Sequence, residues 1–222
     1  MRTHLDHPTL LVVSEPVGPF AMNQYLIVCR ISGQAAIIDA GSEPQPWIRR
    51  AQLAEAKITT ILQTHAHIDH VMGLPATHEA LPGAPIWLHE DEAPVYQSIP
   101  MQARMFGLPS LELPPVDRHY RSDEPVTVGA LSFEPHLLPG HSPGHVCLLL
   151  RAHNLLFGGD LVFAGSIGRT DLPGCDPEVM QQSLRRFLEF DDDLTVLPGH
   201  MGPTTVGRER RSNPFLRSLQ LS

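Results

Sequence analysis

The chain has few cysteines and no long basic block, and each shortage excludes a class of protein. Its three cysteines, Cys29, Cys147 and Cys175, are too few and too far apart for a disulfide framework or a CxxC zinc knuckle. We expect them to be small buried apolar residues in a reducing compartment. No basic block is longer than residues 208–211, and the formal net charge is -8. Nucleic-acid backbones are bound by clustered cations, so we expect no nucleic-acid partner.

Long apolar segments are also missing. Near the N-terminus, the apolar run covers only Leu10 to Val13, between Asp6 and Glu15. This run is too short for a signal-peptide core and far below the ~20 residues that cross a bilayer. We therefore expect a cytoplasmic protein that has no membrane partner.

Histidine, by contrast, is abundant. The sequence has 13 histidines against 16 lysines and arginines together. Because neutral imidazole is the commonest metal ligand in proteins, this composition favours a metal site before any motif is considered.

Predicted strands and helices alternate along the chain. Short runs rich in Val and Ile predict strands at residues 10–13, 24–30, 35–39, 58–63, 85–88, 130–138, 146–151, 154–157 and 194–197. Helical spacing predicts helices at residues 46–56, 70–80 and 177–190, a weakly helical stretch up to residue 106, and a short helix in the tail. No low-complexity linker separates the two halves. The pattern therefore predicts one domain, residues 1–222, of the α/β class, with two sheets packed together and helices outside.

Four clusters of histidine or aspartate each follow a predicted strand. They are His65, His67, Asp69 and His70; His141 and His145; Asp160; and His200. Side chains at strand ends converge on one edge of a sheet. Two histidines and a carboxylate, or three histidines, suffice to hold a divalent metal ion. Seven such residues provide two sets of three ligands and one bridging carboxylate, the arrangement of a two-metal hydrolytic site.

The remaining histidines carry no such pattern. We interpret them as ordinary surface or core residues: His4, His7, His78, His89, His119, His136 and His153.

The motifs THAHIDH, HSPGH, FGGD and PGH, in this order over nearly the whole chain, resemble those of the metallo-β-lactamase superfamily. The resemblance implies an αββα sandwich with the metals at one edge of the two sheets. It also implies two divalent metal ions. We expect zinc, although iron or manganese would accept the same nitrogen and oxygen ligands.

The same resemblance implies a role for each candidate residue. His65, His67 and His141 would hold the first metal, Asp69, His70 and His200 the second, and Asp160 would bridge them. Asp69 and Asp160 are then the expected catalytic carboxylates, and Asp69 would orient the attacking hydroxide. His145 resembles a histidine that is structural in the family and does not bind metal.

Three further segments are similar to a small bacterial subgroup of glyoxalase II-like thioesterases, the hydroxyacylglutathione hydrolase-like proteins. They are QARMFGL at residues 102–108, GSIGRTDLPG at 165–174 and ERRSNPFL at 209–216. The resemblance implies hydrolysis of S-D-lactoylglutathione or a related small acyl thioester by metal-bound hydroxide. A thiolate leaves without a general acid, because the thiol has a pKa of ~8.5. Only about twenty residues follow His200, so we expect weak discrimination for glutathione.

Several alternatives remain open at this point. GRTD also resembles the persulfide dioxygenases, which would hold one Fe(II) through His65, His141 and Asp160. Lactonase and phosphodiesterase chemistry can use the same metals. A protein that only binds a ligand is disfavoured, because it has no physical need for a full two-metal ligand set. Arg169 either binds a substrate carboxylate or forms a salt bridge with Asp171.

Overall fold

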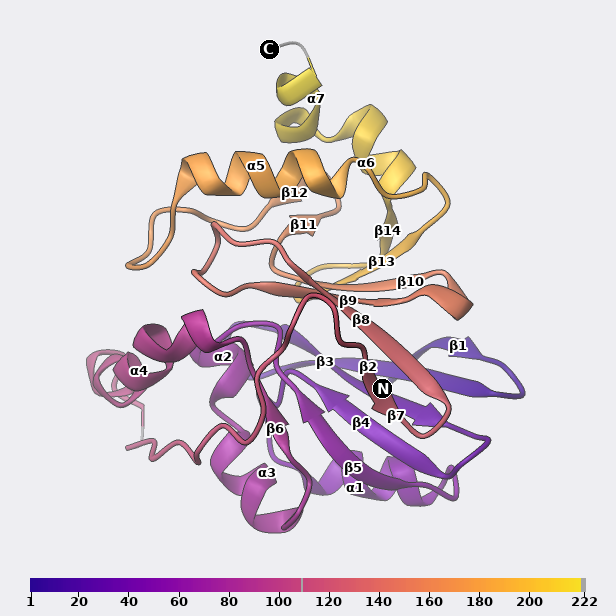
Figure 1. The fold of residues 1–222 in the computed structure, drawn as a ribbon. Helices are drawn as coiled ribbons and strands as arrows, with labels where there is room; N and C mark the ends of the chain where they lie inside the picture. Colours follow the sequence, from indigo (N-terminus) through magenta and orange to yellow (C-terminus); the bar gives the residue numbers. More distant parts are fainter. Residues whose placement is uncertain (109, 221–222) are drawn as a thin grey trace.

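The computed structural model describes residues 1–108 and 110–220. In these residues, two six-stranded sheets lie face to face, with helices on the outer sides (Figure 1). This confirms the expected α/β class and the αββα sandwich. The assignment of residues 1–222 to one domain stays a prediction.

The first sheet comes from the N-terminal half and has the strand order β1-β2-β3-β4-β5-β6. Strands β4, β5 and β6 are parallel, and the other pairs are antiparallel. The strands are β1 (Arg2–Asp6), β2 (Leu10–Val17), β3 (Met22–Cys29), β4 (Gln34–Ile38), β5 (Lys57–Leu62) and β6 (Ile86–Trp87).

The second sheet has the order β14-β13-β10-β9-β8-β7. Strands β10 and β13 are parallel, so their carboxyl ends lie at the same edge. The strands are β7 (Val126–Val128), β8 (Leu131–Leu137), β9 (Val146–Leu150), β10 (Leu155–Gly159), β13 (Thr195–Pro198) and β14 (Thr204–Thr205). A separate two-stranded hairpin, β11 (Val162–Phe163) and β12 (Ser166–Ile167), follows β10.

The helices cover the two outer faces (Figure 1). The first sheet carries α1 (Gln45–Gln52), α2 (Ile68–Val71), α3 (Leu74–Ala80) and α4 (Ala93–Met105). A short 3-10 turn (Glu90–Glu92) precedes α4. The second carries α5 (Pro177–Phe187), α6 (Val206–Ser212) and α7 (Pro214–Gln220). A second 3-10 turn (Arg151–His153) joins β9 to β10. Within the described ranges, no helix has the length and apolar character of a membrane span.

The apolar core is layered in the same way as the backbone. The middle layer lies between the sheets and joins residues of both, such as Ile27 and Leu62 with Phe133 and Phe157. The central strands β3, β9 and β10 bury both faces, and all eight residues of β3 are buried. A strand buried on both faces has no reason to alternate apolar and polar residues, which explains the near-continuous apolar runs in the sequence.

Some predicted boundaries were wrong. The helix expected at residues 70–80 is two helices, α2 and α3, because the backbone N–H of Gly73 donates to the carbonyl oxygen of Ala40 at 2.9 Å and not to a carbonyl of the preceding helical turn. Helix α1 ends at Gln52, before Glu55, which has the left-handed φ of 55°. Helix α5 ends at Phe187 rather than at residue 190. Strands β1, β7, β11, β12 and β14 and helix α6 were not expected from the sequence.

Candidate metal centre

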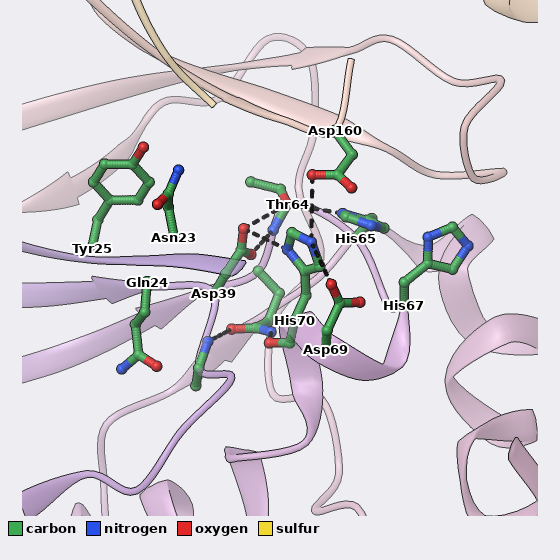
Figure 2. Close-up of polar contacts among 12 residues, drawn as sticks. Asn23, Gln24, Tyr25, Asp39, Thr64, His65, His67, Asp69, His70 and Asp160 are labelled. Carbon is green, nitrogen blue, oxygen red and sulfur yellow. Dashed lines mark hydrogen bonds and ion pairs between the residues drawn. The ribbon is translucent and has the colours of Figure 1, made fainter. Parts of the chain in front are cut away.

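The candidate ligands lie where four strands end at one edge of the sandwich. His65 and His67 follow β5, and Asp69 and His70 lie in the short helix α2. In the second sheet, β8, β10 and β13 lead into the loops of His141, Asp160 and His200. Figure 2 shows Asp160 approaching His65 and His70 from the opposite sheet. The fold thus brings together all the residues that the motifs indicated.

The clustered side chains form three overlapping groups. In each group, one ligand atom per residue lies within 4.8 Å of the others. The groups are His65, His67 and His141; His65, His70 and Asp160; and Asp69, His70 and His200. The first and third groups match the two expected trios, and the second lies between them.

Asp160 has the position expected of a bridging carboxylate. Its Oδ2 lies 3.5 Å from Nε2 of His141, in the first trio, and 3.4 Å from Nε2 of His200, in the second. Its Oδ1 lies 3.5 Å from Nε2 of His70. One carboxylate therefore faces ligand atoms of both trios.

Several buried polar atoms that face the centre have no hydrogen-bond partner in the described residues. Nε2 of His65, Nε2 of His70 and Oδ1 of Asp160 are buried, and none has a hydrogen-bond partner within residues 1–108 and 110–220. Buried polar atoms are normally paired, so unpaired ones need an explanation. Imidazole nitrogen and carboxylate oxygen are the donors that zinc, iron and manganese accept. The residues therefore fit two divalent ions.

Electrostatics divides the cluster into two parts. Burial, together with the neighbouring His141, lowers the pKa of His67 to about 3. Burial acts against the charged form of His200 as well, but hydrogen bonds to Asp160 and Asp69 raise its pKa to about 9. Burial alone would raise the pKa of Asp160, yet His70 and other histidines hold it well below its ordinary value. Burial thus favours the neutral form of His67 in the first trio, whereas the two carboxylates favour the charged form of His200 in the second.

Asp39 and Thr64 orient two of the histidines. Asp39 follows β4 and accepts hydrogen bonds from Nδ1 of His70 at 2.9 Å and from N and Oγ1 of Thr64 at 2.7 and 2.9 Å (Figure 2). Thr64 Oγ1 in turn lies 3.0 Å from Nδ1 of His65. These bonds keep the Nδ1 protons on the outer side, so Nε2 of each ring faces the cluster as a free ligand atom.

Two side chains of β3 fix the backbone of the loop that carries His200. Asn23 donates from Nδ2 to the carbonyl oxygens of Pro198 and Met201, at 3.0 and 2.8 Å. The hydroxyl of Tyr25 donates to the same Pro198 oxygen at 2.7 Å. Strand β3 of the first sheet therefore holds a ligand loop of the second sheet.

The β11–β12 hairpin covers the other side of the centre. The ring of Phe163 packs edge-on against the ring of His200, with the centroids 5.9 Å apart. Just after the hairpin, the carbonyl oxygen of Arg169 accepts a hydrogen bond from Nδ1 of His141 at 2.8 Å. Glu209 and Asn213 fix the hairpin by bonding to N of Gly165 and O of Ser166, at 2.8 and 2.9 Å. This gives the GSIGRTDLPG and ERRSNPFL segments a structural role beside the centre.

The side chain of Arg169 does not point to a free binding position. Its guanidinium forms two hydrogen bonds with the carboxylate of Asp171, at 2.7 and 2.9 Å, and both side chains are exposed. The structure thus contains the salt bridge that was one of the two expectations. Binding of a substrate carboxylate by Arg169 stays a prediction.

Other residues singled out in the sequence lie outside the three groups. His145 accepts a hydrogen bond from the backbone N–H of Asp160 at 2.9 Å. Cys29 and Cys147 are buried as expected, but Cys175 is only half-buried, and its thiol lies 2.8 Å from the carbonyl oxygen of His141. Residues 102–108 form the end of α4 and the turn after it, where Phe106 contacts Phe20. The seven remaining histidines belong to none of the groups found in the described residues.

The residues that orient the ligands were not predicted from the sequence. Asp39 stands at the end of a predicted strand, so the criterion that identified Asp160 could also have identified it. Asn23 had no such signal, nor did Glu92, whose carboxylate accepts hydrogen bonds from N of Ala66 and N of Gly144. They lie far from the motifs in the sequence and reach the centre only through the fold.

Comparison with known proteins agrees with this geometry. Residues 17–200 match the family model described as the metallo-beta-lactamase superfamily. The chain is 38% identical over 206 residues to the hydroxyacylglutathione hydrolase GloC of Haemophilus influenzae, covering 91% of this chain and 96% of that protein. The crystal structure of TTHA1623 in a di-iron-bound form is 38% identical, with a TM-score of 0.83 over 92% of this chain and 100% of that one.

A more distant structure shares the fold alone. ETHE1 from Myxococcus xanthus is 22% identical, with a TM-score of 0.73 over 94% of this chain and 89% of that one. The family match and the GloC similarity both extend over most of the chain. The chain belongs to the metallo-beta-lactamase superfamily.

Proposed function

We propose that this protein is a hydrolase that holds two divalent metal ions, most simply zinc, and cleaves S-D-lactoylglutathione or a related small acyl thioester. The observation that carries the proposal is the pair of trios with Asp160 between them. The similarity to GloC over nearly its whole length supports the substrate class.

In this proposal, each trio holds one ion. His65, His67 and His141 would hold the first, and Asp69, His70 and His200 the second, with Asp160 shared. Bound divalent cations would lower the pKa of water toward ~7, which supplies a hydroxide nucleophile at neutral pH. They would also polarise the carbonyl oxygen of the substrate. Asp69 lies at the more open side of the cluster, 3.1 Å from Nε2 of His200. From there it would accept a hydrogen bond from the attacking water and orient it.

The charges of the centre support a thioester over an amide. Burial raises the pKa of Asp69, but His70 and His200 outweigh it and hold the pKa below its ordinary value. Asp160 is ionised for the same kind of reason. Neither carboxylate therefore carries a proton that it can give to a leaving group at neutral pH. A thiolate with a conjugate pKa of ~8.5 leaves without that proton, whereas an amine does not.

A paired assay on protein of defined metal content tests this function. One arm measures thiol release from S-D-lactoylglutathione under nitrogen, and the other measures oxygen uptake with glutathione persulfide. We expect thiol release without oxygen uptake, and the Asp160→Ala variant gives the background. Oxygen uptake by protein with one iron, together with negligible thioester cleavage, would replace the proposal with a persulfide dioxygenase.

Arg169 provides a test of substrate binding. If Arg169 leaves Asp171 to bind a substrate carboxylate, Arg169→Ala raises KM and leaves kcat nearly unchanged. A fall in kcat at constant KM would place Arg169 at the transition state instead. Unchanged kinetics would mean that the Arg169 side chain does not bind substrate and only forms the exposed salt bridge, which contributes little to stability.

A further inference from the structure

Glu92 is a fully buried carboxylate that none of the sequence motifs includes. It is 0% exposed, although no basic side chain is paired with it in the described part of the chain. Its oxygens accept two backbone hydrogen bonds. Oε2 accepts from N of Ala66 at 2.8 Å, and Oε1 accepts from N of Gly144 at 2.6 Å.

These two N–H groups belong to the two loops that carry the first trio. Ala66 lies between His65 and His67, and Gly144 lies three residues after His141. The loops come from different sheets, so the register between them is a tertiary property. One further backbone bond joins them, from N of Val146 to O of Thr64 at 2.9 Å. Glu92 therefore provides a second connection between the two loops, next to the ligands themselves.

The scaffold behind Glu92 is rigid. Glu92 is the residue before α4, whose Val95, Ile99 and Ala103 are buried in the outer core of the first sheet. The space around the carboxylate is also full. A Cβ atom at Gly144 would lie 3.0 Å from N and 3.1 Å from Cγ of Glu92. A side chain added at Gly144 would therefore press on Glu92 and shift it or the loop by a few tenths of an ångström.

We propose that Glu92 is a positioning residue that holds the loops of His65, His67 and His141 in register and thereby sets the affinity of the first metal ion. A carboxylate can accept from both loops at once because it has two acceptor oxygens. Glutamine has one oxygen, and its amide nitrogen would face a backbone N–H, so donor would meet donor. Loss of such an outer contact lowers metal affinity about 10- to 100-fold.

The test measures each ion separately, by competition for Zn²⁺ with a chromophoric chelator. The His200→Ala background leaves the first trio intact, and the His67→Ala background leaves the second. We expect Glu92→Gln to weaken Zn²⁺ binding about 10- to 100-fold in the His200→Ala background. In the His67→Ala background, we expect a change of less than about threefold.

Two more variants separate positioning from charge and from stability. Gly144→Ala keeps the carboxylate but crowds it, so it should also weaken Zn²⁺ binding in the His200→Ala background. Ile58→Ala removes a buried side chain at the amino end of β5, away from both loops. It should lower the melting temperature and leave the affinity within about threefold.

The proposal is wrong if Glu92→Gln leaves the affinity unchanged in the His200→Ala background, or lowers it equally in both backgrounds. Should Glu92→Gln fail to fold, Gly144→Ala decides the question, because unchanged affinity there would also overturn the proposal. These results do not depend on the substrate. An absent thioesterase activity would therefore contradict the proposed function and leave this inference intact.

Discussion

The contact between Asp39 and His70 allows a quantitative test of how the second ion is held. Asp39 is 1% exposed, and its Oδ2 accepts a hydrogen bond from Nδ1 of His70 at 2.9 Å. The substitution Asp39→Asn keeps the shape of the side chain. It also suits the backbone, because Asp39 has the left-handed φ of 57°, which asparagine tolerates well. Thr64 N can still donate to the remaining oxygen.

The amide changes the chemistry at one atom. With Oδ1 still facing Thr64 N, the Nδ2 group of asparagine faces both Nδ1 of His70 and Oγ1 of Thr64. The hydroxyl of Thr64 can turn to accept from Nδ2, but at His70 two donors meet. His70 relieves the clash by taking the other tautomer, in which Nδ1 accepts and Nε2 carries the proton. Nε2 is the atom that faces Asp69 and Asp160, at 3.8 and 3.5 Å. A protonated Nε2 cannot bind a metal. In the variant, His70 must therefore return to the original tautomer before the second ion binds, and the free energy of this change lowers the affinity.

The size of the effect follows from the bond that is lost. A hydrogen bond to a charged group contributes about 1.5 to 3 kcal/mol. At about 1.4 kcal/mol for each factor of ten, this corresponds to an affinity for the second ion that is about 10- to 150-fold lower. Chelator competition in the His67→Ala background measures it directly.

A matched substitution serves as the control. Asp117→Asn makes the same change in a carboxylate that accepts from the backbone N–H of Ile86 at 2.8 Å, and Asp117 belongs to none of the three ligand groups in the described residues. Its affinity should stay within about threefold of the background. If Asp39→Asn also stays within threefold, Asp39 does not set the tautomer of His70, and the account of the second trio is wrong.

Three further outcomes are expected. At equal metal content, Asp160→Ala should lower kcat/KM far more than His145→Ala, since His145 only accepts from the Asp160 backbone; similar losses would refute the bridging role. Gly168→Ala should destabilise the fold by about 1 to 3 kcal/mol in thermal denaturation, because its Cβ meets the Asp160 carbonyl. Gly202→Ala, with open space, should change stability by less than about 0.5 kcal/mol. Zn²⁺ affinity should rise from pH 7 to about 9, because His200, with its pKa raised to about 9, must lose a proton to bind metal; a flat profile would contradict this.

The sequence predicted the layers of the fold because the central strands of both sheets are buried on two faces. Runs such as Leu10 to Val13 and Ile58 to Leu62 have few polar interruptions, and they became strands. The helix break at Gly73 was missed, because its cause is a backbone hydrogen bond to Ala40, about thirty residues earlier in the chain. The short strands β11, β12 and β14 have two residues each, too few for any periodicity.

The ligand cluster was predictable for a different reason. His65, His67 and Asp69 lie within one short segment that runs from the end of β5 into α2, so their spacing already determines their proximity. Asp39 and Glu92 act through contacts between distant segments. Glu92 is one of three acidic residues in a row, and only the fold shows that this one is buried while Asp91 is exposed. A local pattern can identify ligands, but it cannot identify the residues that hold them.

We expect seven side chains to hold two metal ions in one centre. The most direct measurement is the metal-to-protein ratio, determined by plasma mass spectrometry after saturation with Zn²⁺ and removal of the excess by gel filtration. We expect about two ions per chain, and about one in either the His67→Ala or the His200→Ala variant. A ratio of one or less in the unaltered protein, with all seven side chains intact, would contradict it.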